Sequence, residues 1–228
     1  PLRHSSAASD VYKRQGVAPG KVLILGGGVV GSSAIRVALG MGADVTVLDR
    51  SVSRLGELDE QYRGQLRTVY STAEALEEHV READLIIGAV LIPGASAPKL
   101  VTAKMLADFK PGTVMVDVAI DQGGCFETSR PTTHADPTYV VDGVVHYCVA
   151  NMPGVVARTA TMALTNATLP YIMRLASDEA GSLLLEDRHL AAGLNIVHGQ
   201  LTHRAVADAL CQTWTEPCQI LRNSLHLK

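Results

Sequence analysis

The chain has 228 residues and a formal net charge of −3, from 20 lysine and arginine residues against 23 aspartate and glutamate residues. The balanced charge and the lack of a basic cluster argue against a nucleic-acid partner. No apolar run reaches the ~18 residues that a membrane-spanning helix needs, and no signal peptide opens the sequence. We therefore expect a cytoplasmic protein, and the composition, 47% hydrophobic and 19% charged, is typical of a globular chain.

The four cysteines, Cys125, Cys148, Cys211 and Cys218, lack C-x-x-C spacing. Reduced structural thiols are therefore favoured over a disulfide framework or a zinc site, and no metal is expected. Residues 1–15 show no sustained hydrophobic period and are expected to be disordered, with no assigned role.

A strand, a glycine turn and a helix are predicted over residues 22–42. The apolar run 22–25 is followed by Gly26, Gly28 and Gly31 at G-x-G-x-x-G spacing. In dinucleotide sites the first glycine permits a tight turn, the second lets the backbone approach a pyrophosphate, and the third lets the helix pack against the strand. The phosphates bind unpaired N–H groups at the helix N-terminus. A glycine turn in some other α/β protein is the alternative.

An acidic residue strengthens the prediction of a dinucleotide site. A second apolar strand, 45–48, ends at Asp49, about 20 residues beyond the glycines. A carboxylate in this position accepts hydrogen bonds from ribose hydroxyls and repels a 2′-phosphate. The predicted cofactor is therefore NAD rather than NADP.

Two further helix starts carry candidate contacts. Ser51 is a predicted helix cap, and Arg54 on the first turn either reaches the adenosine or is an exposed helix-face arginine. Ser71 or Thr72 caps an acidic helix over 73–83, and contact of the hydroxyl with adenine is the alternative.

Two more buried strands are predicted at 84–90 and 113–120, with a short helix at 102–109 between them. In an open parallel sheet, the loops at the carboxyl ends of strands line the ligand crevice. The loop 91–99 and Asp121 follow these two strands. Asp121 is therefore a candidate site residue, with a turn-forming aspartate as the alternative.

The alternation of strands and helices predicts an α/β fold, a doubly wound parallel sheet of the Rossmann type. A hairpin follows, with strands 139–141 and 144–149 around the Asp142-Gly143 turn. From Asn151 the pattern becomes helical, over 156–175, 183–192 and 202–210, and the tail 213–228 has no assignment. The expected organisation is a lead (1–15), an NAD-binding domain (16–150) and C-terminal helices of a second, substrate lobe (151–228).

Four segments resemble alanine dehydrogenase: GADVTVLD, ADLIIGAVLIPGASAPKLV, VDVAIDQGGCFETSRPTTHADPTY and YCVANMPGVVARTATMALTNATLPYI. The likeness extends over residues 16–221, and that family shares its fold with the nucleotide domain of proton-translocating transhydrogenases. The resemblance implies an oxidoreductase that converts L-alanine, NAD and water reversibly into pyruvate, ammonia and NADH. It also implies a homo-oligomer, a hexamer in the family.

The resemblance further implies roles for individual residues. Asp121 and Asn151 would be catalytic, and Val29 and Val30 would lie beside the pyrophosphate. The full cofactor-binding set that it implies is Gly26, Gly28, Val29, Val30, Gly31, Asp49, Arg54, Ser71, Val90, Leu91, Val118, Ala119, Ile120, Asp121, Arg130, Val149, Ala150, Asn151 and Met152.

One departure from the family limits the expected activity. The family's large N-terminal segment forms most of the substrate lobe and supplies an arginine, a lysine and a histidine, which residues 1–15 do not resemble. We therefore expect this chain to bind NAD with little or no turnover. The alternatives are a non-catalytic NAD(H)-binding module and a transhydrogenase-like subunit.

Overall fold

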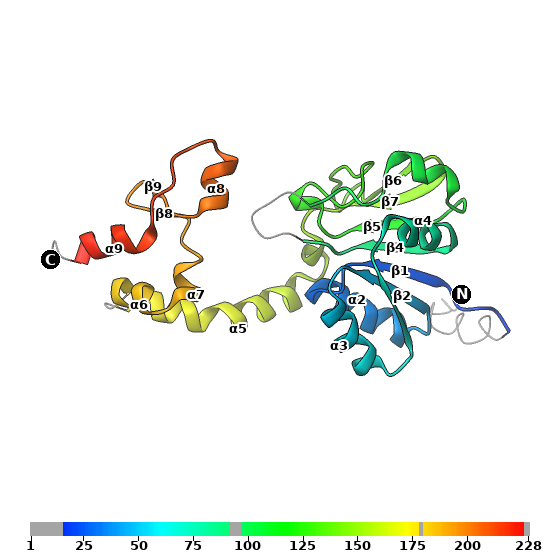
Figure 1. The fold of residues 1–228 in the computed structure, drawn as a ribbon, viewed down its shortest axis with the longest axis horizontal. Helices are drawn as coiled ribbons and strands as arrows, with labels where there is room; N and C mark the ends of the chain where they lie inside the picture. The colour runs from blue at the N-terminus through cyan, green and yellow to red at the C-terminus, as the bar shows by residue number, and fades with distance from the viewer. Residues whose placement is uncertain (1–15, 92–96, 178–179, 226–228) are drawn as a thin grey trace, which may run out of the picture. The chain divides into compact units, whose positions relative to one another are not determined.

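The computed structural model describes residues 16–91, 97–177 and 180–225. They form two compact units (Figure 1). The first contains a seven-stranded sheet and extends to Met152, and the second begins at Pro153.

The first unit alternates strands with helices or 3-10 turns. Its elements are β1 (Lys21–Leu25), α2 (Val29–Gly40), β2 (Asp44–Asp49), α3 (Val52–Tyr62), β3 (Leu66–Tyr70), α4 (Ala73–Glu82), β4 (Leu85–Gly88), η1 (Ala103–Asp108), β5 (Val114–Asp117), η2 (Ile120–Gln122), β6 (Thr138–Val141) and β7 (Val144–Tyr147). The strand order is β3-β2-β1-β4-β5-β7-β6, and every neighbouring pair is parallel except β6 and β7. The predicted α/β fold of the Rossmann type is therefore confirmed.

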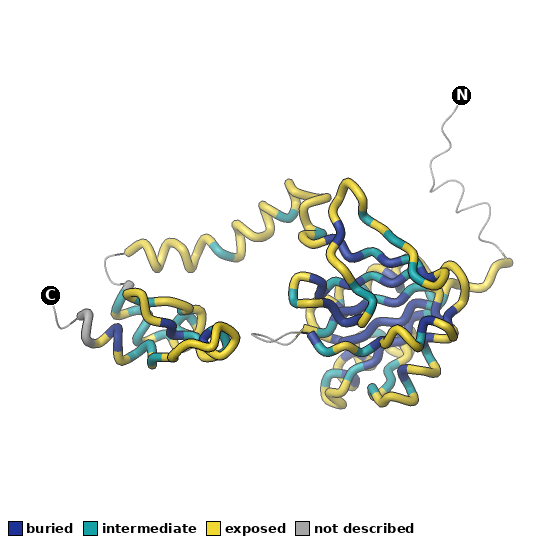
Figure 2. Tube along the Cα trace, turned by 90° about the horizontal axis from the view of Figure 1, so that it is seen from above, coloured by how far each residue is buried: buried dark blue, intermediate teal, exposed yellow. Residues whose placement is uncertain are grey.

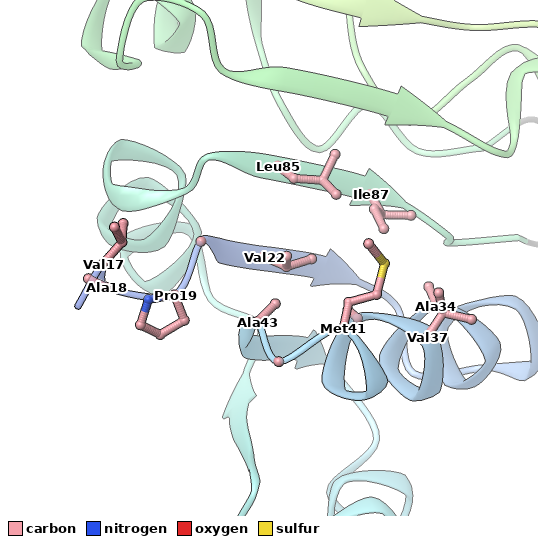
Figure 3. A pocket seen from close by; sticks show the side chains of 13 residues that line it. Val17, Ala18, Pro19, Val22, Ala34, Val37, Met41, Ala43, Leu85 and Ile87 are labelled. Carbon is pink, nitrogen blue, oxygen red and sulfur yellow. The ribbon is translucent and has the colours of Figure 1, made fainter. Parts of the chain in front are cut away.

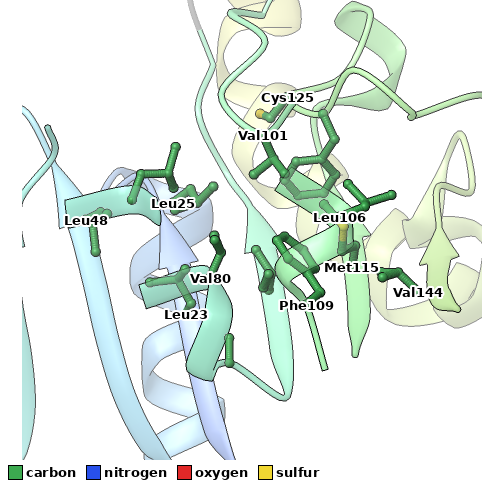
Figure 4. Close-up of a cluster of buried hydrophobic side chains, with 14 of the residues drawn as sticks. Leu23, Leu25, Leu48, Val80, Val101, Leu106, Phe109, Met115, Cys125 and Val144 are labelled. Carbon is green, nitrogen blue, oxygen red and sulfur yellow. The ribbon is translucent and has the colours of Figure 1, made fainter. Parts of the chain in front are cut away.

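Each face of the sheet has its own apolar core, because strand side chains alternate between the faces. The strands form the buried centre of the unit (Figure 2). On one face α4 and η1 pack on the sheet, and the buried residues include Leu23, Leu25, Val80, Ile86, Leu106 and Met115 (Figure 4). On the other face α2 and α3 pack on it, and the buried residues include Val22, Ile24, Ile35, Val45, Val47 and Leu58.

The second of these faces has an apolar groove of about 770 Å³ beside α2 (Figure 3). Val37 of α2 and Met41, which follows the helix as its C-cap, are 58% and 70% exposed. Every lining residue is apolar: Val17, Ala18, Pro19, Gly20, Val22, Ala34, Val37, Ala38, Met41, Gly42, Ala43, Leu85 and Ile87. The groove therefore presents an apolar surface without titratable side chains among the residues that line it.

Three sequence predictions for the first unit are corrected. β3, at Leu66–Tyr70, was not predicted. The strand expected at 113–120 ends at Asp117, so the next residues form a turn instead. Asp121 therefore lies in the 3-10 turn η2 and not at the end of the strand.

The predicted hairpin is confirmed, since β6 and β7 pair antiparallel around Asp142 and Gly143. Both turn residues have positive φ, 49° and 79°. That combination is the type I′ turn, whose twist matches the twist of the flanking strands.

The second unit contains η3 (Met152–Val156, which begins at the boundary), α5 (Ala157–Leu175), α6 (Ala180–Glu186), α7 (Arg188–Ala191), β8 (Ile196–Val197), β9 (Gln200–Leu201), α8 (Arg204–Ala209) and α9 (Pro217–Leu225). The prediction of helices alone was wrong here, because β8 and β9 form a hairpin. The helix expected at 183–192 is interrupted at Asp187, whose carboxylate accepts hydrogen bonds from the N–H groups of His189 and Leu190 and so caps a new helix.

Helix α5 has no buried residue and presents large apolar side chains to its surroundings. The exposed ones include Met162, Leu164, Tyr171, Ile172 and Met173, each more than half exposed. Of the helices that the structure describes, none has the length and hydropathy to cross a bilayer.

We predict that His146 makes the stability of the chain depend on pH. Its Nδ1–H donates to the carbonyl of Val144 at 3.1 Å, so the neutral ring accepts at Nε2 from the Thr128 hydroxyl, 2.8 Å away. Burial lowers the pKa of His146 below its ordinary 6.5. The stabilising contribution of the neutral ring is complete above the unfolded-state pKa and declines as pH falls toward the lower folded-state pKa.

The measurement is thermal unfolding between about pH 8 and about pH 5. A His146→Gln variant should lose less stability over this range than the unaltered chain, because glutamine does not titrate. The matched control is His189→Gln, on an exposed helix. Equal pH dependence in the unaltered chain and His146→Gln would contradict the assignment.

We also predict that Cys125 resists thiol reagents. Burial raises the pKa of its thiol to about 11, and the negative charge of Asp117 acts in the same direction. Cys211 is exposed. Because the thiolate is the nucleophile, alkylation of Cys125 in the folded chain should be slower than alkylation of Cys211 by roughly a hundredfold or more. Mass spectrometry of samples taken over time measures the fraction of each cysteine that is alkylated. Equal rates at Cys125 and Cys211 would refute the prediction.

Candidate functional site

A cavity of about 560 Å³ lies at the carboxyl ends of β1, β2 and β4. The chain order reverses between β1 and β4, which are neighbours in the sheet although β2 and β3 lie between them in sequence. Open α/β sheets bind ligands at such a switch point. The lining residues are Leu25, Gly26, Gly28, Val29, Val30, Leu48, Asp49, Arg50, Ser71, Ala89, Val90, Leu91, Pro98 and Leu100.

The turn between β1 and α2 requires glycine at two of the three predicted positions. A Cβ on Gly31 would lie 1.8 Å from the carbonyl oxygen of Gly26. Gly26 has φ of 97°, and a Cβ there would lie 2.9 Å from the carbonyl oxygen of Ala89. Helix α2 can therefore begin directly at the end of the strand only with these glycines.

The N-terminus of α2 faces the cavity through Gly28, Val29 and Val30. No side chain caps the helix. The N–H groups of Val29 and Val30 precede the first helical bond, from Ser32 N–H to Gly28 carbonyl, and have no acceptor among the described residues. A Cβ on Gly28 would meet nothing within 4 Å. Open space beside unpaired donors suits the approach of a phosphate.

Asp49 also lines the cavity, and both of its carboxylate oxygens accept hydrogen bonds. Oδ2 accepts from the N–H of Gly27 at 2.7 Å, and Oδ1 accepts from the N–H of Ser51 at 2.8 Å. The carboxylate is thus fixed at the end of β2 beside the glycine turn. Each carboxylate oxygen retains a further lone pair that could accept a hydrogen bond from a ligand hydroxyl.

Arg54 and Ser71 have different surroundings. Ser71 lines the cavity. Thr72, and not Ser71, is the residue that caps α4. Arg54 is not a lining residue. Its guanidinium donates from Nε to the Gly27 carbonyl and from a terminal nitrogen to the Ser32 hydroxyl, both at 2.7 Å, and pairs with Glu57. In this structure Arg54 holds the outside of the glycine turn.

The cavity brings together eight of the predicted cofactor residues: Gly26, Gly28, Val29, Val30, Asp49, Ser71, Val90 and Leu91. Sequence reasoning missed Leu25, Leu48, Arg50, Ala89, Pro98 and Leu100. Leu25 and Leu48 are the last apolar residues of their strands, and Pro98 and Leu100 flank the end of the crevice loop. In the sequence, only their positions next to predicted site residues could have indicated that they line the cavity.

The remaining predicted residues lie outside the lining of this cavity. Ala119, Ile120 and Val149 are buried, whereas Asp121 and Arg130 are exposed. The others, placed on the same two segments, are Val118, Ala150, Asn151 and Met152. The Asp121 carboxylate has no hydrogen-bond or ion-pair partner among the described residues, so both of its oxygens are available to a ligand or to water.

Arg130 is placed by Tyr139. The guanidinium lies 4.0 Å from the centre of the Tyr139 ring, and the ring of His146 is also stacked on Tyr139, at 4.9 Å between ring centres. The phenol oxygen accepts from the N–H of Arg130 and donates to the Thr128 carbonyl. Burial raises the pKa of Tyr139, so the phenol remains a neutral donor.

Asn151 has φ of 64°, in the left-handed region that asparagine tolerates better than most residues. Its carbonyl accepts a hydrogen bond from Nε2 of His134 at 3.0 Å. The backbone of Asn151 is therefore anchored to the segment that also contains Arg130.

Known proteins resemble this chain in sequence and in fold. Residues 7–204 match the family described as "Alanine dehydrogenase/PNT, C-terminal domain". An alanine dehydrogenase of Halomonas elongata is 65% identical over 206 residues, which is 90% of this chain and 56% of that protein. An alanine dehydrogenase of Mycolicibacterium smegmatis is 52% identical, with the same coverage.

Solved structures agree with these sequences. An L-alanine dehydrogenase superposes with a TM-score of 0.78 at 50% identity, over 86% of this chain and 54% of that one. A transhydrogenase from Sinorhizobium meliloti gives 0.66 at 28% identity, over 83% of this chain and 51% of that one. The chain thus spans about half the length of the curated relatives it matches. It belongs to the alanine dehydrogenase/PNT family, with the part that it represents being the family's C-terminal domain.

Proposed function

We propose that this chain is the nucleotide-binding part of an NAD-dependent alanine dehydrogenase. The observation that carries the proposal is the uncapped N-terminus of α2, which opens into the cavity beside the fixed carboxylate of Asp49. The N–H groups of Val29 and Val30 would hold the pyrophosphate, and Asp49 would accept from the ribose. The names of relatives at 52% and 65% identity support alanine as the substrate.

The reaction would convert L-alanine, NAD+ and water into pyruvate, ammonia, NADH and a proton, in either direction. When bound, the nicotinamide supplies the acceptor for the hydride of the alanine α carbon. The unpaired carboxylate of Asp121 would accept a hydrogen bond from the substrate amino group, or a proton from the water that hydrolyses the imine. Asn151 would lie near the reacting carbon, and Arg54, Arg130 and the other predicted residues would complete the cofactor site. A homohexamer is part of the same proposal.

The relatives favour a dehydrogenase over a transhydrogenase-like subunit, because identity falls to 28% with the transhydrogenase. A non-catalytic module would differ in behaviour. It would bind NADH but leave binding unchanged when alanine or pyruvate is added.

The first test is a fluorescence titration of the 228-residue chain with NADH and with NADPH. We expect saturable binding that prefers NADH, because the Asp49 carboxylate repels a 2′-phosphate. Asp49→Asn removes the charge and retains one acceptor oxygen, so the preference should shrink by about tenfold, equivalent to about 1.4 kcal/mol. Asp59→Asn, an exposed acid of α3 outside the cavity, is the matched control. Failure of the unaltered chain to bind either nucleotide, with a folded circular dichroism spectrum, would refute the proposal.

The second test is turnover. Because the chain spans about half the length of its relatives, we expect an alanine-dependent rate of NADH formation far below that of a full-length relative. Loss of substrate-positioning groups can remove ~7 to 11 kcal/mol of barrier lowering. A rate within about tenfold of the relative's would contradict this expectation.

A further inference from the structure

Lys99 binds a turn rather than a carboxylate. Its ammonium donates to three backbone carbonyls: those of Gly123, of Gly124 at 2.9 Å and of Phe126 at 3.1 Å. An ammonium has three donors, so all of them are used. No ion pair with an acidic side chain involves Lys99 among the described residues.

The backbone on either side of Lys99 joins the same turn. The N–H of Ala97 donates to the Gln122 carbonyl at 3.0 Å, and the N–H of Leu100 donates to the Cys125 carbonyl at 2.7 Å. Segment 97–100 and the turn 119–126 therefore form one hydrogen-bonded structure. Its other edge is part of the cavity, because Pro98 and Leu100 line it.

Asp117 binds N–H groups of the same turn, whereas Lys99 binds its carbonyls. Its buried carboxylate accepts from the N–H groups of Ala119, Cys125 and Phe126, at 3.2, 2.8 and 3.3 Å, and from the Ser129 hydroxyl at 2.5 Å. The turn thus gives its N–H groups to a carboxylate and its carbonyls to an ammonium. The Lys99 ammonium is balanced by backbone carbonyls, and the Asp117 carboxylate by backbone N–H groups and the Ser129 hydroxyl; in the part of the chain that the structure describes, neither forms an ion pair.

The geometry of the turn depends on this arrangement. Gly124 has φ of 78°, and a Cβ there would lie 2.6 Å from the Asp117 carboxylate. Asp121 lies within the turn, after the N–H of Ala119, which Asp117 binds, and before the three carbonyls that Lys99 binds. The backbone that carries its carboxylate is therefore held by two residues, Asp117 and Lys99, that do not themselves line the cavity.

We propose that Lys99 is a positioning residue, which fixes the turn 119–126 and so aims Asp121 at the nicotinamide side of the cofactor site. The inference rests on the proposed function. It assigns Lys99 no contact with the cofactor. Removing its ammonium should loosen the nicotinamide half of the site and leave the adenosine half, formed by the glycine turn and Asp49, intact.

The experiment separates the two halves by ligand. The 228-residue chain and a Lys99→Met variant, which keeps chain length and removes the charge, are titrated with NADH and with ADP-ribose, which lacks nicotinamide. We expect ADP-ribose affinity to change less than twofold. The advantage of NADH over ADP-ribose should fall by about tenfold, and the enhanced emission of bound NADH should fall with it. Lys104→Met is the control, at an exposed lysine of η1 that makes no hydrogen bond to the turn among the described residues.

A second comparison tests whether Lys99 acts through Asp121. Asp121→Asn alone should reduce the same NADH advantage. The double variant should be no worse than the more affected single variant, because coupled residues give non-additive effects. Lys99→Arg keeps the charge and should therefore recover part of the NADH emission that Lys99→Met loses. The same variant replaces Lys99→Met in the titrations if Lys99→Met does not fold.

The outcomes are distinguishable. Equal losses for NADH and ADP-ribose would make Lys99 a general support of the fold and overturn the inference, as would no change for either ligand or additive losses in the double variant. Absence of binding by the unaltered chain would instead count against the proposed function.

Discussion

The close contact between Gly31 and Gly26 is the constraint on which the site depends. Only a hydrogen in place of a side chain at Gly31 lets α2 start against the carbonyl of Gly26. This places the first N–H groups of the helix at the end of β1, beside the ends of β2 and β4. The parallel sheet aligns those strand ends, and the switch in chain order between β1 and β4 opens the space among them. The close contact between Gly31 and Gly26 thus places at the cavity those N–H groups of α2 that have no acceptor among the described residues.

Much of the nucleotide half was predictable from sequence, because its signals are local. An apolar run, three spaced glycines and an acid after the next strand identify β1, α2, β2 and the turn between β1 and α2. β3 was missed because LRTVY mixes Arg67 with apolar residues in a strand at the edge of the sheet. The end of β5 was misplaced because Val118, Ala119 and Ile120 continue an apolar pattern. These residues belong to a turn in which Ala119 and Ile120 are buried, and an apolar sequence is expected of a buried turn as well as of a buried strand.

The other half of the site was less predictable for a physical reason. Asp117 and Lys99 bind backbone groups of residues that are up to 27 positions away. Every residue except proline offers an N–H and a carbonyl, so no residue type at the receiving end marks such a contact. Arg54 illustrates the same limit, since its guanidinium binds the Gly27 carbonyl. Charged side chains that serve the backbone look, in sequence, like surface charges.

Asp49 has a consequence for how coenzyme preference can change. The two oxygens that the proposed function assigns to a ribose also accept the N–H groups of Gly27 and Ser51. A substitution that admits a 2′-phosphate therefore leaves at least one of these donors without its acceptor. Selection for a new coenzyme would act against stability at the same residue. An evolutionary route to NADP in this scaffold would need a second, compensating acceptor near the turn before or together with the loss of the acid.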